Sequence, residues 1–349
     1  MRSRTLAALS VVTVIAVAAA GLSVSREMSV REPGGVGQKM LPGLMDMLNG
    51  AGSIVVQGLG SKVTMVRTDD GWTIAERGGY PARAPKVREL ILGMARLERI
   101  EAKTRLEKRY SRLNVEGPEK EGAKSKNITI FDENGGVLSE LIVGKRRFTL
   151  EGQKGVYVRI PGDAQAWLAK GALNPGVTPT EWLRREIADI AAKRIAAVSI
   201  RHPGGQTLRL SKEAPEEEHF KVEDLAKGAK LKNAAAADEI AAALASLELD
   251  DVAPSSEVEF NADGVIRADF TTFDGLRASV MLSLNDGADW ARLTFASDLG
   301  ASQSGASQSG NGEEAGELNA RTGGWAYRIP VYKASLFKKR LADLIQVEK

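Results

Sequence analysis

Tyr157-Val158-Arg159-Ile160-Pro161 and Tyr327-Arg328-Ile329-Pro330 resemble each other closely enough to indicate that the chain repeats itself. A second pair indicates the same, because Trp72-Thr73-Ile74-Ala75-Glu76 is matched by Phe220-Lys221-Val222-Glu223-Asp224. Aromatic and β-branched residues that alternate with other residues are typical of strands. The two matches therefore predict two tandem related domains.

Short strands divided by turns fill both predicted domains, residues 53–175 and residues 196–349. Asp69-Asp70-Gly71, for example, is a tight turn between two strands. An amphipathic helix opens at Pro85, because proline suits the first turn of a helix. We therefore predict an α+β fold in which each domain is a mainly antiparallel sheet with packed helices. Strands are expected over residues 53–57, 62–68, 72–76, 127–132, 137–143 and 156–160, and over residues 197–201, 207–211, 219–222, 265–272 and 277–284.

Capping residues predict further helices. Asp163 is a good N-cap, so a helix is expected to begin near it. Thr178-Pro179-Thr180-Glu181 combines a capping box with proline in the first turn, which predicts a helix over residues 176–195 that links the two domains. In the second domain, helices are expected from Asn233 to about Leu247 and over residues 333–345.

The N-terminus carries a long apolar run. No residue between Arg4 and Arg26 is charged. A helix needs about 20 apolar residues to cross a bilayer, so residues 1–26 are expected to form one transmembrane helix. Arg2 and Arg4 precede the run, which predicts a single-pass inner-membrane protein with its body in the periplasm. The alternative is a cleaved secretory signal, because Ala18-Ala19-Ala20-Gly21 offers small residues at the end of the run.

Two segments are expected to lie outside the packed sheets. Residues 27–52 begin as a Gly-rich tether and end in a short amphipathic helix whose apolar residues run from Met40 to Leu48. Residues 299–317 contain the tandem sequence Ala-Ser-Gln-Ser-Gly and are expected to form a disordered loop.

Composition argues against several classes of function. The 48 Lys and Arg residues are balanced by 45 Asp and Glu residues, and the two signs are mixed, which is unlike a nucleic-acid-binding surface. Cysteine is absent, which removes disulfides and thiolate chemistry. The two histidines, His202 and His219, lack other ligands at metal-site spacing and are expected at the surface or at sheet edges.

No motif of catalysis or cofactor binding stands out. Gly58-Leu59-Gly60 lacks the third glycine of a dinucleotide loop, and Val143-Gly144-Lys145 lacks the Ser or Thr of a phosphate-binding loop. No serine lies in G-x-S-x-G, and acidic runs such as Glu216–Glu218 are typical of exposed loops. We therefore assign no catalytic, cofactor-binding or metal residue and expect a protein that is not an enzyme.

The most basic stretch lies in the first domain. It suits anionic lipid headgroups or an acidic partner, although a solvated face with salt bridges has the same pattern. Its basic residues are Lys103, Arg105, Lys108, Arg109 and Arg112.

Several of these segments together resemble the DUF4340 family of bacterial envelope proteins, a domain of unknown function. The resemblance is carried by Leu41-Pro42-Gly43-Leu44, Gly71-Trp72, Tyr80-Pro81-Ala82, Glu101-Ala102-Lys103-Thr104, Arg109-Tyr110, Leu113, Tyr157-Val158-Arg159, Gln165-Ala166-Trp167-Leu168-Ala169 and Trp182-Leu183. It looks like the proteobacterial branch, whose members are typically encoded beside ABC transporters of the gliding-motility auxiliary type. No catalytic residues come with the family.

The resemblance implies an auxiliary component of an ABC-type transport system, with permease and ATPase subunits as partners. Nothing in the second domain matches the segments around Tyr80, Lys103, Thr104, Arg109 and Tyr110, so these five residues are candidates for an interaction site in the first domain. Two other functions stay open. A binding module for an envelope polymer or lipid would have an aromatic-lined groove, and a carboxylate-dependent hydrolase would have two acidic side chains facing one pocket.

Overall fold

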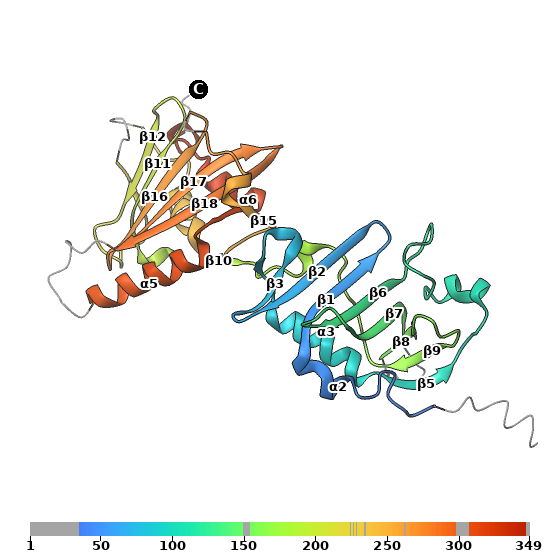
Figure 1. Cartoon of the computed structure of the whole chain (residues 1–349). Helices are drawn as coiled ribbons and strands as arrows, with labels where there is room; N and C mark the ends of the chain where they lie inside the picture. Colours follow the sequence, from blue (N-terminus) through green and yellow to red (C-terminus); the bar gives the residue numbers. More distant parts are fainter. Residues whose placement is uncertain are drawn as a thin grey trace, which may run out of the picture. The chain divides into compact units, whose positions relative to one another are not determined.

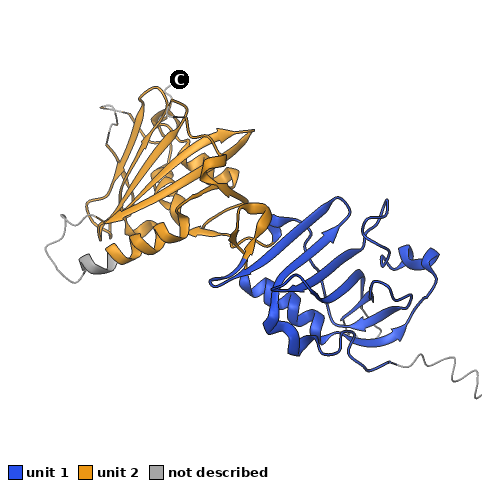
Figure 2. Cartoon of the chain, in the orientation of Figure 1, with its two compact units in different colours: residues 1–72, 84–181 blue, residues 73–83, 182–349 orange. Residues whose placement is uncertain are grey.

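The computed structural model describes residues 35–148, 154–223, 225, 227, 229–233, 235–261, 263–297 and 307–346. The predicted membrane anchor and most of the tether lie outside the described residues. Within the described ranges, no helix is both long enough and apolar enough to cross a membrane. The chain forms two compact units, shown in Figure 2: unit 1 is residues 1–72 and 84–181, and unit 2 is residues 73–83 and 182–349.

The first sheet has nine strands in the order β4-β3-β2-β1-β6-β7-β8-β9-β5 (Figure 1). Its strands are β1 (Ala51–Gly58), β2 (Ser61–Thr68), β3 (Gly71–Ile74), β4 (Tyr80–Pro81), β5 (Glu98–Ala102), β6 (Lys126–Asp132), β7 (Val137–Phe148), β8 (Lys154–Arg159) and β9 (Ala166–Lys170). The helical elements between them are α2 (Leu44–Met47), η1 (Leu48–Gly50), η2 (Ala75–Arg77), α3 (Ala84–Arg96) and η3 (Glu107–Arg112). β4 and the end of β3 cluster with unit 2.

One face of this sheet forms the core of unit 1. Ile54 on β1 pairs with Met65 on β2 and with Ile130 on β6, so all three side chains point to the same face, and all three are fully buried. Helix α3 turns Val87, Leu90 and Met94 inward at the spacing of one helical face, as its apolar stripe predicts.

Unit 2 contains an eight-stranded sheet in the order β13-β12-β11-β16-β17-β18-β19-β15. Its strands are β11 (Ile195–Arg201), β12 (Thr207–Ser211), β13 (Lys221–Val222), β15 (Asp251–Pro254), β16 (Ile266–Thr272), β17 (Leu276–Asn285), β18 (Ala288–Ser297) and β19 (Trp325–Arg328). Two short strands, β10 (Glu186–Ala188) and β14 (Leu247–Glu248), pair separately. The helical elements are η4 (Pro179–Glu181) in unit 1, and η5 (Ala192–Arg194), α4 (Ala236–Ala241), η6 (Ala242–Leu244), η7 (Ser255–Glu257), α5 (Ser307–Thr322), α6 (Val331–Phe337) and α7 (Leu341–Leu344) in unit 2.

Helices pack on the unit 2 sheet through aromatic and apolar side chains. Phe270 of β16 meets Phe337 of α6 edge to face, with ring centres 6.1 Å apart. Helix α5 lies along β18 (Figure 1). The Asn319 side-chain amide accepts a hydrogen bond from the Phe295 N–H at 2.9 Å and donates one to the Phe295 carbonyl at 2.7 Å. α5 thereby satisfies the backbone of β18 where β19 does not pair with it.

The two sheets run through their strands in the same order. β3-β2-β1-β6-β7-β8-β9-β5 corresponds strand by strand to β13-β12-β11-β16-β17-β18-β19-β15. The β1–β6 ladder and the β11–β16 ladder also shift register at matching places, between Ala51 and Ser53 in the first sheet and between Ile195 and Ala197 in the second. The α+β fold with two mainly antiparallel sheets and packed helices is confirmed.

The strand order corrects one of the two sequence matches. Tyr157 lies on β8, whereas Tyr327 lies on β19, which corresponds to β9. Trp167 pairs with Val158 on β8, and Tyr327 pairs with Ala291 on β18, so Tyr327 holds the position of Trp167. The Arg-Ile-Pro segments are alike because proline ends a strand in both places, not because the strands are equivalent.

Two predicted helices do not form. After Asp163, whose Oδ1 accepts a hydrogen bond from the Gln165 N–H at 2.8 Å, the chain enters strand β9. The side chain of an N-cap aspartate accepts a backbone hydrogen bond of the same kind, but here the bond closes a turn. The expected linking helix over residues 176–195 is replaced by η4, β10 and η5. The Thr178 hydroxyl donates to the Glu181 carboxylate at 2.9 Å instead of capping a helix.

Three other expectations also differ from the structure. The short helix after the tether is limited to α2 and η1. Within the segment expected to be disordered, residues 307–317 belong to helix α5, and residues 299–306 lie outside the described residues. His202 is only 3% exposed, and its Nε2–H donates to the Lys339 carbonyl at 2.9 Å, so the expectation of a surface or edge histidine was wrong for this residue. His219 is exposed and lies beside Asp238.

Candidate functional site

The basic stretch of unit 1 belongs to the connection from β5 to β6, residues 103–125. Its first residues extend the ladder between β5 and β9. The Lys103 N–H donates to the Ala166 carbonyl at 2.8 Å, and the Ala166 N–H donates to the Thr104 carbonyl at 2.8 Å. The Lys103 ammonium pairs with Glu101, and the Thr104 hydroxyl accepts a hydrogen bond from the Leu106 N–H at 3.1 Å. Both residues therefore fix the connection to the sheet.

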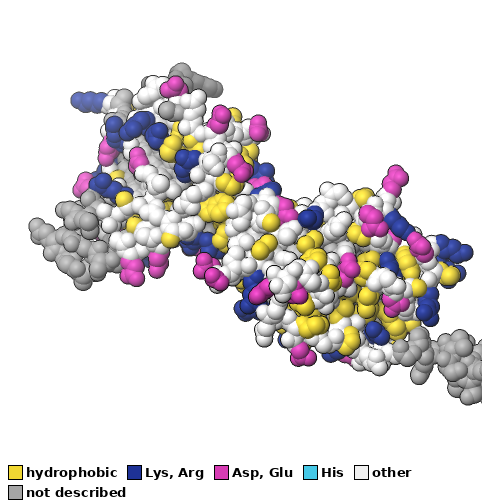
Figure 3. All heavy atoms as spheres, viewed as in Figure 1, with side chains coloured by type: hydrophobic (Ala, Val, Ile, Leu, Met, Phe, Trp, Pro, Cys, Tyr) yellow, Lys and Arg dark blue, Asp and Glu magenta, His cyan; other side chains and the backbone are white. Residues whose placement is uncertain are grey.

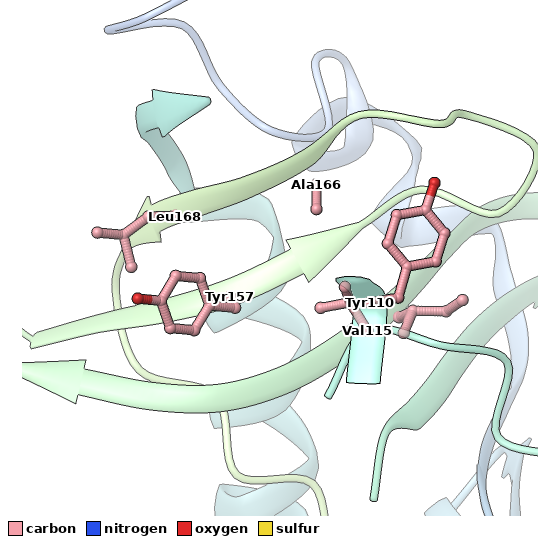
Figure 4. Close-up of a cluster of buried hydrophobic side chains, with 6 residues drawn as sticks. Tyr110, Val115, Tyr157, Ala166 and Leu168 are labelled. Carbon is pink, nitrogen blue, oxygen red and sulfur yellow. The ribbon is translucent and has the colours of Figure 1, made fainter. Parts of the chain in front are cut away.

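Tyr110 anchors the middle of this connection. It lies on η3, is 6% exposed, and its hydroxyl donates to the Ala164 carbonyl in the β8–β9 turn at 2.6 Å. Figure 4 shows its ring among Val115 and the side chains of the β8 and β9 strands. The connection thus covers part of the sheet face opposite the core of unit 1 with a second apolar cluster. Its members are Tyr110, Val115, Ile142, Tyr157, Ala166 and Leu168.

Arg159, the last residue of β8, completes this anchor. Its guanidinium carbon lies 4.5 Å from the centre of the Tyr110 ring. Its Nε donates to the Val115 carbonyl at 2.9 Å, and its Nη1 donates to the Asp163 carbonyl at 3.2 Å. The cation–π contact and the two bonds to backbone oxygens hold the connection in place, and no carboxylate among the described residues pairs with Arg159.

A hollow of about 340 Å³, open to solvent, lies beside Tyr110 and Arg159. An ion pair between Glu107 and Lys120 crosses its rim. The hydrogen bond from Lys120 lowers the pKa of the Glu107 carboxyl and raises the pKa of the Lys120 ammonium. A carboxylate held in its ionised form is a poor general acid. The other residues that line the hollow are Gly117, Glu119, Gly162, Asp163 and Ala164.

The remaining two candidates lie in different environments. The Arg109 side chain is exposed on η3 and makes no hydrogen bond or ion pair with another described residue. Tyr80 belongs to unit 2, where it is fully buried. Its ring lies 5.0 Å from Trp325 and 6.2 Å from Tyr327, and its hydroxyl donates to the Arg184 carbonyl at 3.1 Å. The structure therefore brings together Lys103, Thr104 and Tyr110 but places Tyr80 in another core.

Unit 2 repeats the anchor of Tyr110 and Arg159. Arg159 is the register partner of Ile142 on β7, and Arg292 on β18 is the register partner of Met281 at the corresponding position of β17. The Arg292 guanidinium carbon lies 4.4 Å from the centre of the Phe260 ring. Its Nη2 donates to the Ser255 carbonyl at 2.9 Å, within the connection from β15 to β16.

Sequence reasoning missed this second anchor. By register, Trp290-Ala291-Arg292 corresponds to Tyr157-Val158-Arg159. The shared pattern is an aromatic residue two places before an arginine. That signal is present in the sequence, but the longer Arg-Ile-Pro match at Arg328 obscured it.

Acidic side chains gather at another hollow, of about 360 Å³, in unit 2. Glu186 pairs with Arg321, and Glu314 pairs with Arg194. Asp189 Oδ1 accepts a hydrogen bond from the Ser246 N–H at 2.7 Å. These contacts tie the three carboxylates to arginines and to a backbone N–H, which suits a structural role better than paired acid and base catalysis.

The largest hollow that we describe, about 710 Å³, lies over β1, β2 and the β6–β7 turn of unit 1. It is lined mainly by polar and charged residues, with Val66 as its one large apolar side chain and no aromatic ring. This lining does not match the aromatic-lined groove expected of a polymer-binding module.

Comparison with known proteins identifies a family. A family model described as a domain of unknown function, DUF4340, matches residues 72–263, more than half of the 349 residues. Neither the curated proteins nor the solved structures contain a match to the chain. The matched region begins in β3 and ends before β16, so it includes both the Tyr110 anchor and the Phe260 ring. This chain therefore belongs to the DUF4340 family.

Proposed function

We propose that this chain is a non-enzymatic periplasmic protein, anchored in the inner membrane by its N-terminal apolar run, and an auxiliary component of an ABC-type transport system. Its partners in this proposal are the permease and ATPase subunits of an ABC transporter of the gliding-motility auxiliary type, beside which members of the proteobacterial branch of the family are typically encoded. The uncharged run between Arg4 and Arg26 and the family membership support this proposal.

The observation that carries the proposal is that polar groups around η3 form hydrogen bonds within the protein. The Tyr110 hydroxyl and the Arg159 guanidinium are bonded to backbone oxygens, and Glu107 is bonded to Lys120. These contacts fix a connection in place and leave η3 as a projecting basic edge. A fixed surface that displays charge is suited to docking a partner protein.

η3 displays its basic side chains to solvent. Lys108, Arg109 and Arg112 are exposed, and their side chains make no ion pair with other residues in the described part of the chain. Lys and Arg side chains are spread among Asp and Glu side chains on the face in Figure 3. A local run of unpaired cations within such a mixed surface favours an acidic docking partner.

The test is a pull-down of the tagged full-length protein from native membranes in mild detergent, with mass spectrometry of the bound proteins. We expect a permease and its ATPase at near-stoichiometric yield. Arg109→Glu should reduce that yield, whereas Arg88→Glu, on the exposed side of α3, is a matched control that should not. Recovery of the protein alone from the soluble fraction, without its first residues, would reject the proposal and favour a cleaved, ligand-binding protein.

A further inference from the structure

Arginines gather on one face of the unit 2 sheet, opposite its core. Arg201 on β11 is the direct cross-strand partner of Arg267 on β16. The neighbouring residues Ile200 and Ala268, which point the other way, are buried in the core. Arg267 in turn pairs with Met281 on β17. In Figure 3, several Lys and Arg side chains lie over the part of unit 2 where Figure 1 places β11 and β12.

The pairing of Arg201 with Arg267 is unfavourable by itself. Directly opposed residues of a sheet have Cβ atoms about 4.5–5.5 Å apart, so two positive charges at these positions repel each other. Neither guanidinium makes a hydrogen bond or ion pair with another described residue. The nearby carboxylate of Asp269 accepts a hydrogen bond from the Ser279 hydroxyl at 2.6 Å instead. Two cations are thus held side by side, and neither forms an ion pair with a residue that the structure describes.

The first sheet shows that the fold does not need arginine at these positions. Gln57 on β1 and Asn127 on β6 are the corresponding cross-strand pair in unit 1. Asn127 Nδ2 donates to Glu140 Oε1 at 2.6 Å, so the side-chain N–H group at this position bonds within the protein. Because the same strand order and register form with neutral residues, the arginine pair is not explained by folding.

We propose that Arg201 and Arg267 form a clamp for a phosphomonoester group on a soluble ligand. A phosphomonoester carries about −1.5 to −2 charges at pH 7, which matches two guanidinium groups, whereas a carboxylate or a phosphodiester carries one. Planar guanidinium forks donate paired hydrogen bonds to phosphate oxygens, and each fork can take a different side of the same group. Arg292 on the same face is not part of the clamp, because it is bonded to Ser255 and stacked on Phe260. This inference does not rest on the proposed function.

The test is isothermal titration calorimetry of the full-length protein in detergent with inorganic phosphate, at an ionic strength held constant with chloride. The double variant Arg201→Gln with Arg267→Asn carries the residues found at the matching positions of unit 1 and should keep the fold. We expect it to bind phosphate roughly tenfold more weakly or worse, because each lost fork removes charge-assisted hydrogen bonds. The variant Arg201→Lys with Arg267→Lys keeps the charge, removes the forks and should also bind more weakly.

A matched control removes two positive charges elsewhere. Arg105 and Arg112 are exposed in unit 1, and changing both to Gln should leave phosphate binding unchanged. Equal weakening in this control would overturn the clamp, because binding would then reflect net charge alone. The clamp is also overturned if wild-type protein does not bind phosphate. Binding to phosphatidylglycerol vesicles or to polyglutamate that depends on Arg201 and Arg267, without phosphate binding, would assign the face to a membrane or an acidic protein instead.

Discussion

At the scale of single residues, an arginine stacked on an aromatic ring is the device that both units use. Arg159 lies over Tyr110, and Arg292 lies over Phe260, at nearly equal distances of 4.5 and 4.4 Å. In each case the arginine also donates to a backbone carbonyl of the connection that carries the ring. The charged side chain therefore holds the strand and the segment that covers it together.

We predict that Arg159→Gln lowers the free energy of unfolding by about 1–3 kcal/mol, through loss of the cation–π contact and of hydrogen bonds from a charged donor. Urea unfolding followed by circular dichroism measures the change. Arg146→Gln, at an exposed position on β7, is the control and should change stability by less than about 0.5 kcal/mol. Equal effects of the two substitutions on the free energy of unfolding would show that the contacts of Arg159 do not stabilise the fold.

A second residue-scale prediction concerns alkaline pH. Burial raises the pKa of the Tyr327 hydroxyl above its ordinary value of 10.0, and the neighbouring Tyr80 raises it further. When the pH is well below the ordinary pKa, both the folded and the unfolded chain keep this tyrosine neutral. When the pH rises above the ordinary pKa, the unfolded chain loses the proton while the folded chain keeps it, so the free energy of unfolding falls as pH rises.

Tyr327→Phe should therefore lose less stability than wild type between about pH 9 and about pH 11, since the unfolded variant has no proton to release at this position. The measurement is the urea midpoint at the two pH values. Tyr332, 64% exposed, supplies the control, and Tyr332→Phe should show the wild-type alkaline loss. If Tyr327→Phe is as sensitive to alkali as wild type, the buried hydroxyl does not govern this response.

At the scale of elements, helix α5 shows where prediction from the sequence reaches its limit. The Ser and Gly residues of its first turns have low helix propensity, and the tandem repeat before and within it carries no apolar residues at helical spacing, so this segment predicts disorder. The helix forms because Ala315, Leu318, Asn319 and Thr322 lie on one face and meet β18, and Ala315, Leu318 and Thr322 are buried. Tertiary packing overrides local propensity here.

The Asn319 contact predicts how α5 is held. Asn319→Ala should remove both hydrogen bonds to Phe295 and speed hydrogen exchange in residues 307–322 and at the Phe295 amide, by roughly tenfold or more if the two bonds contribute about 1.4 kcal/mol. Mass spectrometry of peptides from both segments reports the exchange. Asn319→Asp keeps the acceptor for the Phe295 N–H but not the donor, so its effect should be smaller at that amide. Unchanged exchange in Asn319→Ala would mean that apolar packing alone holds α5.

Strand β9 illustrates a second limit of prediction from the sequence. Trp167 faces the core side, and Ala166 and Leu168 lie in the cluster under Tyr110, so both faces of this strand are buried. The usual alternation of apolar and polar residues is then absent, and a buried strand cannot be told from a helix by period. By contrast, β1, β2 and α3 were predictable, because each has one buried face and clear turn or capping residues.

At the scale of the whole chain, the division into units does not follow the sequence order. Residues 73–83 belong to unit 2 although they lie within the sequence of unit 1. Arg77 pairs with Asp251, with a 2.6 Å bond from its Nε and a 3.0 Å bond from its Nη2, and Tyr80 packs on Trp325. The repeat in the sequence predicted two sheets, but residues 73–83 are too short to carry a periodic signal of their own.

Tyr80→Ala tests this organisation. The truncation should cost on the order of 3–5 kcal/mol in unit 2, as expected for removing a buried aromatic side chain. Hydrogen exchange should increase in β15 and β19, next to Tyr80, and stay at the wild-type rate in β8 and β9 of unit 1. Increased exchange confined to unit 1 would mean that Tyr80 stabilises that unit instead.

Because the chain is synthesised from its N-terminus, residues 73–83 are made before most of the unit in which they pack. Tyr80 leaves the ribosome long before Trp325 and Tyr327, the rings on which it packs, and domains tend to fold from the N-terminus as they emerge. During that interval the Tyr80 ring lacks the two rings on which it packs and is open to other chains. A product that ends early, after unit 1 but before β19, would leave the Tyr80 ring without Trp325 and Tyr327 permanently, so an incomplete chain would differ from the complete one at a residue made near its beginning.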